Sequence, residues 1–168
     1  MKDLGTELSA EKKLQLNLYI DGASKGNPGM AGAGVWMTNQ EGKKLLGMSR
    51  YLGHKTNNEA EYWALLIGLR EALRWGGRSI HIFTDSELIA RQVKGIYRVK
   101  GSNLKGLHEE VMANLKAFSS FEIESIPREE NGEADRLANE AIRRKRVTEK
   151  GKEEGRRNTD GRSSFHPT

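Results

Sequence analysis

Hydrophobic and polar residues alternate in the first part of the chain. From Leu14 to Asp21 every second residue is apolar, which is the pattern of a strand with one buried face. Residues 32–38 and 43–52 have strand-like composition, and residues 39–42, Asn-Gln-Glu-Gly, suit the hairpin turn between them. These features predict three strands joined by short turns, that is, an antiparallel meander.

The period of the pattern changes after this meander. Residues 58–75 predict a long helix, because apolar side chains recur there at helical spacing: Tyr62, Leu65, Leu66, Leu69 and Leu73. Asn57 or Asn58 is suited to cap its first turn, and Gly76 and Gly77 end it.

The remaining patterned segments predict a strand, two helices, a further strand and a last helix, at residues 79–84, 86–93, 104–118, 121–126 and about 131–144. The element order is therefore β-β-β-α-β-α-α-β-α. It predicts an α/β fold with a mixed five-stranded sheet, in which three antiparallel strands are followed by parallel crossovers and helices flank the sheet.

Composition divides the 168 residues into one folded domain and two polar ends. Residues 1–12 predict a flexible N-terminus, and residues 146–168, with almost no apolar side chains, predict a basic disordered tail. The folded domain is then 13–145. The net charge of +5 comes from residues 143–168, where nine Lys and Arg face four acids, so the folded part is close to neutral.

Several classes of protein are disfavoured. The chain has no cysteine, so disulfides and Cys-ligated metals are excluded, and it has neither an apolar signal core nor an apolar run of about 18 residues. We expect a cytoplasmic monomer without a membrane partner. Residues 88–108 contain five basic residues and no acid. They predict either a phosphate-facing patch or an ordinary solvated face.

Four acids occupy related places in the predicted elements. Asp21 ends the first strand and precedes a glycine-rich turn, and Asp85 follows the fourth strand. Glu61 and Asp135 lie in the first turns of the long helix and of the last helix. If the first and fourth strands are parallel neighbours, these four carboxylates meet at one edge of the sheet.

Each acid also has a purely structural explanation. Asp85 can cap the following helix, and Glu61 and Asp135 can favour the positive end of a helix dipole by about 0.3–1 kcal/mol. Together, however, four carboxylates repel one another unless cations hold them. Without cysteine or a histidine pair, the preferred cations are Mg²⁺ or Mn²⁺. Two such ions about 3.5–4 Å apart support phosphodiester hydrolysis.

Four segments of the chain resemble type 1 ribonuclease H, of the ribonuclease H-like superfamily. They are YIDGASKGNPG (19–29), TNNEAEYWALLIGL (56–69), FTDSELI (83–89) and NGEADRLANEA (131–141), in the family's order and at compatible spacings. The resemblance covers about residues 14–145. It implies an endoribonuclease that hydrolyses the RNA strand of RNA/DNA hybrids and leaves 5′-phosphate and 3′-hydroxyl ends.

The resemblance also implies the site residues. The catalytic residues, which also bind two ions of Mg²⁺ or Mn²⁺, are Asp21, Glu61, Asp85 and Asp135. Asp21 bridges both ions, and Asp135 completes the coordination of the ion that activates water. Glu61 and Asp85 hold the ion beside the leaving 3′-oxygen.

The implied partner is the RNA/DNA hybrid. Its contacts fall in two segments and comprise Gly22, Ser24, Gly26, Asn27, Thr56, Asn57 and Asn58. Ser24 and Gly26 contact 2′-hydroxyls of RNA, which distinguish RNA from DNA. Thr56 and Asn58 hold a phosphate of the DNA strand, and the two other asparagines lie in the minor groove.

The chain departs from the family pattern in three places. The loop 125–135 lacks the histidine that many members carry, so Arg128 or Glu129 substitutes for it or product release is unassisted. A long basic protrusion is reduced to residues 96–106. Glu87 stands where some members have a glutamine that touches bases, and its carboxylate either weakens that contact or joins the metal site. The shortened basic segment leaves open a relaxed nuclease that also cuts double-stranded RNA. Two alternatives from other classes are an inactive hybrid-binding module, against which the presence of all four acids argues, and a structural role in a larger nucleoprotein assembly.

Overall fold

The computed structural model describes residues 15–163, with side chains described as far as residue 157. The predicted flexible N-terminus, residues 1–12, lies outside the described residues. The elements follow the predicted order, with one additional 3₁₀ turn: β1 (Gln15–Gly26), β2 (Gly29–Thr38), β3 (Lys44–Lys55), α2 (Asn57–Arg74), β4 (Ser79–Thr84), α3 (Glu87–Val93), α4 (Ser102–Leu115), β5 (Ser120–Ser125), η1 (Arg128–Glu130) and α5 (Gly132–Ser163).

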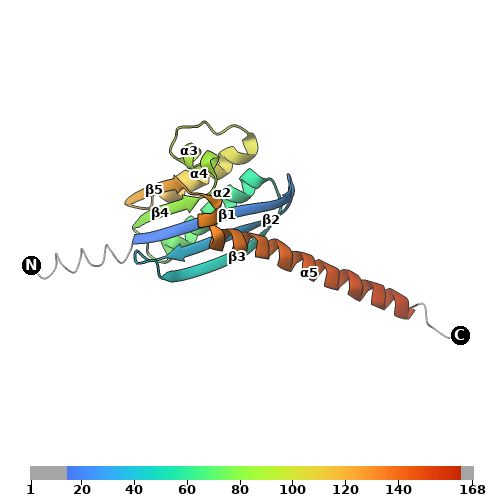
Figure 1. The fold of residues 1–168 in the computed structure, drawn as a ribbon. Coiled ribbons are helices and arrows are strands. Elements are labelled where there is room, and N and C mark those ends of the chain that lie inside the picture. Colours follow the sequence, from blue (N-terminus) through green and yellow to red (C-terminus); the bar gives the residue numbers. More distant parts are fainter. Residues whose placement is uncertain (1–14, 164–168) are drawn as a thin grey trace, which may run out of the picture.

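The strands form one mixed five-stranded sheet in the order β3-β2-β1-β4-β5. The pairs β1–β2 and β2–β3 are antiparallel, whereas β1–β4 and β4–β5 are parallel. The predicted fold class is therefore confirmed. Figure 1 shows β1 at the centre of the sheet, where it has an antiparallel neighbour on one side and a parallel neighbour on the other.

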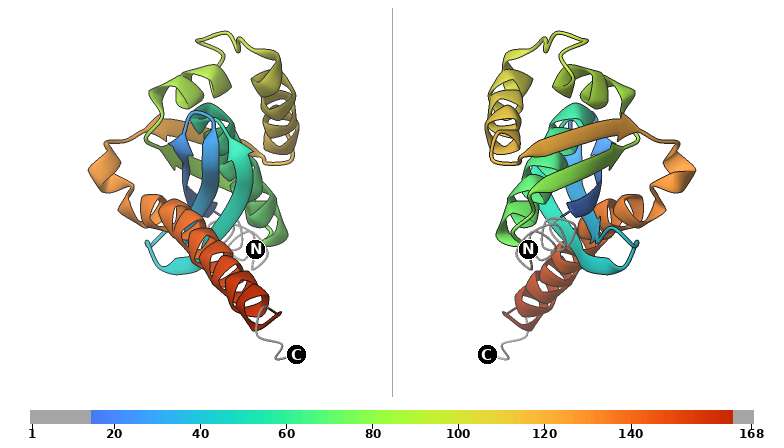
Figure 2. Two further views of the ribbon diagram at one scale, coloured as in Figure 1. Left: turned by 90° about the vertical axis from the view of Figure 1, so that its right-hand side faces the viewer. Right: turned by 90° about the vertical axis from the view of Figure 1, so that its left-hand side faces the viewer.

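Helices α2 and α5 cover opposite faces of this sheet. Leu18 and Val35 of the strands are fully buried and belong to the same core cluster as Leu65 of α2. Gly34, which is next to Val35 on β2 and so faces the other way, lies directly under Ala134 of α5. Figure 2 shows α5 and α2 on opposite sides of the sheet. A central strand covered on both faces can hold a polar side chain away from bulk water.

The first strand is longer than its alternating pattern predicted. β1 continues beyond Asp21 to Gly26, because β2 pairs with it along that whole stretch. Its parallel pairing with β4 stops earlier, at Tyr19 and Phe83. Asp21 is therefore not at a strand end. It lies where β1 no longer has a neighbour on the β4 side.

The start of α2 also differs from the prediction. Thr56, and neither Asn57 nor Asn58, is the N-cap residue. Its side chain accepts a hydrogen bond from the Glu59 N–H at 3.2 Å, and Glu59 Oε1 accepts one from the Thr56 N–H at 3.0 Å. This capping box satisfies two exposed donors of the first turn. Because the helix starts earlier than predicted, Glu61 lies in its second turn.

The last helix differs most from the prediction. Disorder was expected from residue 146, but α5 continues as a helix to Ser163. The segment is rich in Glu, Lys and Arg, which favour helices even where nothing is buried. Residues 164–168 of the predicted tail lie outside the described residues. None of the helices between residues 15 and 163 combines the length and the apolar character of a bilayer span.

Candidate functional site

The strand register brings Asp21 and Asp85 side by side. Tyr19 of β1 pairs with Phe83 of β4, and the two strands run in the same direction. Asp21 lies two residues after Tyr19, and Asp85 lies two residues after Phe83. They therefore occupy equivalent positions just beyond the last paired residues. The predicted meeting of these acids at the end of β4 is confirmed, although β1 itself continues.

Helix α2 supplies the third acid through a close contact with β1. The Gly22 N–H donates to Glu61 Oε1 at 2.9 Å. A Cβ at Gly22 would lie 2.3 Å from the carbonyl carbon of Ala60, so only glycine permits this approach. Gly22, predicted as a substrate contact, thus also has a structural role: it lets the backbone of β1 touch α2 and orient Glu61.

The three carboxylates form a compact and largely buried cluster. Asp21, Glu61 and Asp85 each offer an oxygen, and these oxygens lie within 4.8 Å of one another. Asp21 is 4% exposed and Glu61 is 7% exposed. Among the described residues Glu61 Oε2 is buried without a hydrogen-bond partner. A buried anionic oxygen without a donor is costly for the protein alone and suits a cation.

Electrostatics in the cluster favour protonation when no cation is present. Burial raises the pKa of Asp21 far above its usual range, and the neighbouring Glu61 raises it further. Burial raises the pKa of Glu61 to about 7, although its hydrogen bonds oppose the shift. Burial also raises the pKa of Asp85. Clustered oxygen ligands of this kind fit a hard divalent cation, which would let all three carboxylates ionise.

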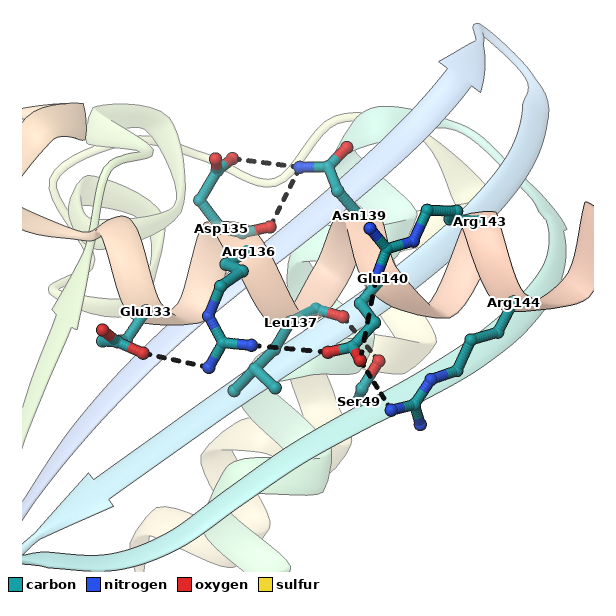
Figure 3. A network of polar contacts seen from close by, with 9 residues as sticks. All are labelled: Ser49, Glu133, Asp135, Arg136, Leu137, Asn139, Glu140, Arg143 and Arg144. Carbon is teal, nitrogen blue, oxygen red and sulfur yellow. Dashed lines mark hydrogen bonds and ion pairs between the residues drawn. The ribbon is translucent and has the colours of Figure 1, made fainter.

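Asp135 lines the same cleft from α5 but is not part of this compact group of oxygens. Its Oδ1 accepts from Arg128 at 3.5 Å and from the Asn139 side chain at 3.3 Å. Figure 3 shows Asn139 one turn farther along α5. Its side-chain nitrogen donates to the backbone carbonyl of Asp135 as well as to Oδ1. The structure therefore brings all four predicted acids to one cleft, three in direct proximity and Asp135 at its wall.

Close packing of α5 on the sheet fixes the place of Asp135. A Cβ on Gly34 would lie 1.9 Å from the Ala134 carbonyl oxygen, and one on Gly32 would lie 2.3 Å from the Ala138 carbonyl oxygen. The Ser49 hydroxyl donates to the Leu137 carbonyl at 2.6 Å, a link from β3 that Figure 3 shows. Sequence reasoning missed these positions, because a glycine in a strand does not reveal which backbone lies above it.

Asn131 is a second positioning residue that sequence reasoning missed. It is 1% exposed, and its side-chain nitrogen donates to the Ile20 carbonyl of β1 at 2.9 Å. Its own carbonyl accepts from the Asp135 N–H at 3.1 Å. Asn131 thus ties the start of α5 to the strand that carries Asp21. An asparagine at the start of the predicted last helix was the only signal in the sequence.

Four of the seven predicted substrate contacts line the acidic cleft, which encloses about 450 Å³: Gly22, Ser24, Asn57 and Asn58. The Ser24 hydroxyl donates to the Lys55 carbonyl at 2.8 Å or, alternatively, to the Gly26 carbonyl. Its lone pairs remain available to a hydroxyl donor of a ligand. Asn57 and Asn58 are exposed and lie at the start of α2.

The other three predicted contacts, Gly26, Asn27 and Thr56, lie next to the cleft and do not line it. Asn27 Oδ1 accepts from the Asn57 N–H at 3.2 Å, which links the β1–β2 hairpin to α2. Gly26 has a φ of 118°, a backbone conformation that favours glycine. These residues shape the rim, and their contact with a substrate remains a prediction.

Two local predictions are corrected around Asp85. Ser86, not Asp85, caps α3, since its side chain accepts from the Ile89 N–H at 3.2 Å. Glu87 is exposed, forms an ion pair with Arg91, and takes no part in the carboxylate cluster. Asp85 is therefore free of a capping role and faces the cleft.

Similarity to known proteins supports the assignment that fold and cleft suggest. The mixed sheet with its acidic cleft defines a ribonuclease H-like domain. A family model described as reverse transcriptase-like matches residues 19–141. A ribonuclease HI of Halobacterium salinarum is 32% identical over 140 residues, which cover 83% of this chain and 70% of that protein. The chain belongs to the ribonuclease H family.

Solved structures and longer relatives agree. The ribonuclease H1 structure from Halobacterium salinarum has a TM-score of 0.75 at 34% identity and covers 76% of this chain and 97% of that one. LC11-RNase H1 in complex with an RNA/DNA hybrid has a TM-score of 0.73 at 38% identity, with 77% and 97% coverage. A bifunctional protein of Mycobacterium tuberculosis is 37% identical over 130 residues, 77% of this chain. The chain spans only 36% of that relative.

Proposed function

We propose that this protein is an endoribonuclease that hydrolyses the RNA strand of RNA/DNA hybrids and leaves 5′-phosphate and 3′-hydroxyl ends. The observation that carries the proposal is the buried group of Asp21, Glu61 and Asp85, with its unpartnered Glu61 oxygen, at the bottom of an open cleft. Folding alone gives no reason to hold three carboxylates so close together. Membership of the ribonuclease H family and the hybrid-bound structure of LC11-RNase H1 supply the substrate class.

Asp21, Glu61, Asp85 and Asp135 would hold two ions of Mg²⁺ or Mn²⁺. Such ions, when bound, supply an activated water and stabilise the leaving oxygen of a phosphodiester. Asp21 has Glu61, Asp85 and Asp135 as neighbouring acids, all of which raise its pKa, and is the acid best placed to share both ions. Asp135, which accepts hydrogen bonds from Arg128 and Asn139, would complete the coordination of the ion that activates water.

The chain's own residues would orient the hybrid. Ser24 and the backbone around Gly26 offer polar groups for the 2′-hydroxyls of the RNA strand, a feature that DNA lacks. Asn57 and Asn58 line the cleft at the start of α2, next to its N-cap residue Thr56. The N-terminus of α2 thus offers Thr56 and Asn58 to a phosphate of the DNA strand. Arg128, exposed and paired with Asp135, is the cation in the place where many members carry a histidine.

The test uses one labelled RNA strand hybridised to DNA, paired with RNA, or single-stranded, incubated with the protein and Mg²⁺ or Mn²⁺. We expect cutting of the hybrid alone, with a 5′-phosphate on the downstream product. Cutting of double-stranded RNA as well would show relaxed recognition and revise the substrate range. A folded protein that binds the hybrid but cuts none of the three in either metal would overturn the proposal in favour of a binding module.

A further inference from the structure

A second groove continues the acidic cleft along α5. It encloses about 590 Å³ and is lined by one residue of β1 and seven of α5: Lys25, Asp135, Arg136, Asn139, Glu140, Ile142, Arg143 and Arg146. Three of these, Lys25, Asp135 and Asn139, also line the acidic cleft. We call this second groove the α5 groove. A strand that leaves the cleft on this side passes directly into it.

The α5 groove is positively charged where it is open. Two acids line the groove, and one of them, Asp135, also lines the acidic cleft. The other, Glu140, accepts hydrogen bonds from Arg144 at 2.6 Å and from Arg136 at 3.5 Å, as Figure 3 shows. Glu140 is thus largely neutralised by its own helix. Lys25 and Arg146 form no ion pair with the other side chains described between residues 15 and 157. These two cations, one from β1 and one from α5, are free to meet an anion.

The positive face extends beyond the body of the protein. At about 3.6 residues per turn, Arg143, Arg146, Lys150 and Arg157 fall on the same face of α5 as Asn139, together with one acid, Glu153. All four cations are exposed. From Arg143 to Arg157 the helix spans about 21 Å. Figure 1 shows this part of α5 projecting away from the sheet as a single rod.

The composition of this projection indicates the kind of partner. Between residues 143 and 157, Val147 is the only large apolar side chain, and it is 66% exposed. A helix that lies on a membrane or pairs in a coiled coil needs a continuous apolar stripe, which is missing here. A partner held by charge alone, with regularly spaced phosphates, fits the face better.

We propose that the α5 groove and the basic face beyond it bind the phosphate backbone of the hybrid outside the acidic cleft. The inference rests on the proposed function, because it takes the hybrid as the occupant of the cleft. The family match ends at residue 141, so the part of this surface from Ile142 onward lies outside the matched residues. A span of about 21 Å corresponds to about six base pairs at 3.4 Å each, so hybrids that extend about six base pairs farther should bind more tightly.

The experiment compares two double variants with equal loss of charge. Arg146→Gln/Lys150→Gln removes two cations from the proposed face, and Lys145→Gln/Lys152→Gln removes two from the other side of the same helix. Binding to a short hybrid and to one about six base pairs longer is measured with Mg²⁺ over a range of salt concentrations. All proteins carry Asp85→Asn, so that the RNA stays intact, and melting curves confirm that each is folded.

For the long hybrid we expect the Arg146/Lys150 variant to bind about tenfold more weakly at low salt. Its logarithmic salt slope should fall by about two, which is about one for each phosphate that the variant no longer neutralises. The control variant should match the parent protein on both hybrids. Equal behaviour of the two variants, or an equal loss of affinity for short and long hybrids, would overturn the inference. So would binding to vesicles of anionic lipid that disappears only in the Arg146/Lys150 variant, while hybrid binding is unchanged.

Failure of the proposed function would look different. The proposed function would be wrong if the protein with intact Asp85 cut neither the short nor the long hybrid. If that protein cuts the short hybrid, and the two double variants nevertheless bind the long hybrid equally, only the inference about α5 is wrong.

Discussion

The two halves of α5 are one continuous helix in opposite surroundings. In the first half Ala134 and Ala138 are fully buried and rest on the backbone of β2, while Asp135 between them faces the cleft. In the second half, from Arg143 to Arg157, nearly every side chain is exposed and charged. The comparison shows how one element can both position a reactive group by packing and present a surface by charge.

The same contrast separates the acids from the bases. The carboxylates of Asp21 and Glu61 are buried, and burial raises the pKa of both. The cations of α5 remain in water, where isolated charges cost little and are screened by salt. A buried acid cluster therefore suits a cation held by several carboxylate oxygens, whereas the exposed bases suit a weak, salt-dependent contact with an extended anion.

The largest effect is expected from neutralising an acid of the cluster. Asp85→Asn should lower the rate of hybrid cleavage on the order of 10³-fold, since losing about 4 kcal/mol of metal-assisted stabilisation costs that much. Single-turnover cleavage with hybrid binding measured in parallel checks this. Glu110→Gln is the matched control, because Glu110 is an exposed acid of α4 that pairs with Arg70 outside the cleft, and it should cut at nearly the parent rate. Equal cleavage rates for the two variants would show that Asp85 is not part of the catalytic site.

The buried half of α5 should be sensitive to one methyl group. In Gly34→Ala the new Cβ would lie 1.9 Å from the Ala134 carbonyl oxygen, so backbone must move. We expect a loss of about 1–3 kcal/mol, or about 2–12 °C in melting temperature, together with reduced cleavage because Asp135 shifts. Gly106→Ala in α4 has no atom within 4 Å of its new Cβ and should leave the protein as stable or more so. A stable, fully active Gly34→Ala would refute this packing account.

Stability without metal should fall as the pH rises. The folded-state pKa values of Asp21 and Glu61 lie above those of free carboxyls, so the folded protein binds more protons than the unfolded chain. Their contribution is complete below about pH 4 and is lost as the pH rises through about 7 for Glu61. Added Mg²⁺ at about ten times its dissociation constant should then restore about 1.4 kcal/mol at pH 8 and less at pH 5. Thermal melts at both pH values measure this, and a pH-independent metal effect would contradict it.

The smallest effect is expected in the exposed half of α5. A Cβ added at Gly151 or Gly155 would have no atom within 4 Å. Replacing both glycines by alanine therefore raises the helix propensity of this exposed segment without a steric clash. Helical content by circular dichroism should rise slightly, while the melting temperature of the domain should change by less than about 1 °C. A large shift in melting temperature would mean that this half is packed against the body after all.

Much of the fold followed from local patterns. The alternation in β1 and the helical spacing of Leu65 and Leu69 predicted the correct element order, and with it the meeting of Asp21 and Asp85. What local patterns could not give is backbone proximity. Gly22 and Gly34 matter because another backbone lies within 2.3 Å of a would-be Cβ, and such contacts exist only in three dimensions.

The errors in the prediction have physical causes as well. Thr56 rather than a neighbouring asparagine caps α2, because a threonine with glutamate three residues later forms a reciprocal capping box. The disorder expected after residue 146 assumed that a segment must bury apolar surface to be ordered. α5 instead extends a helix that the sheet has already nucleated, and adding residues to an existing helix is much easier than starting one.

Calorimetric titration with Mn²⁺ near pH 6, in buffers of different ionisation enthalpy, tests the central claim most directly. If the cluster of Asp21, Glu61 and Asp85 is protonated without metal and ionised with it, binding must release protons, and the observed heat must depend on the buffer. Asp21→Asn should weaken binding and release fewer protons. Binding without proton release, or identical titrations for the parent protein and Asp21→Asn, would contradict the assignment of this buried cluster as the metal site.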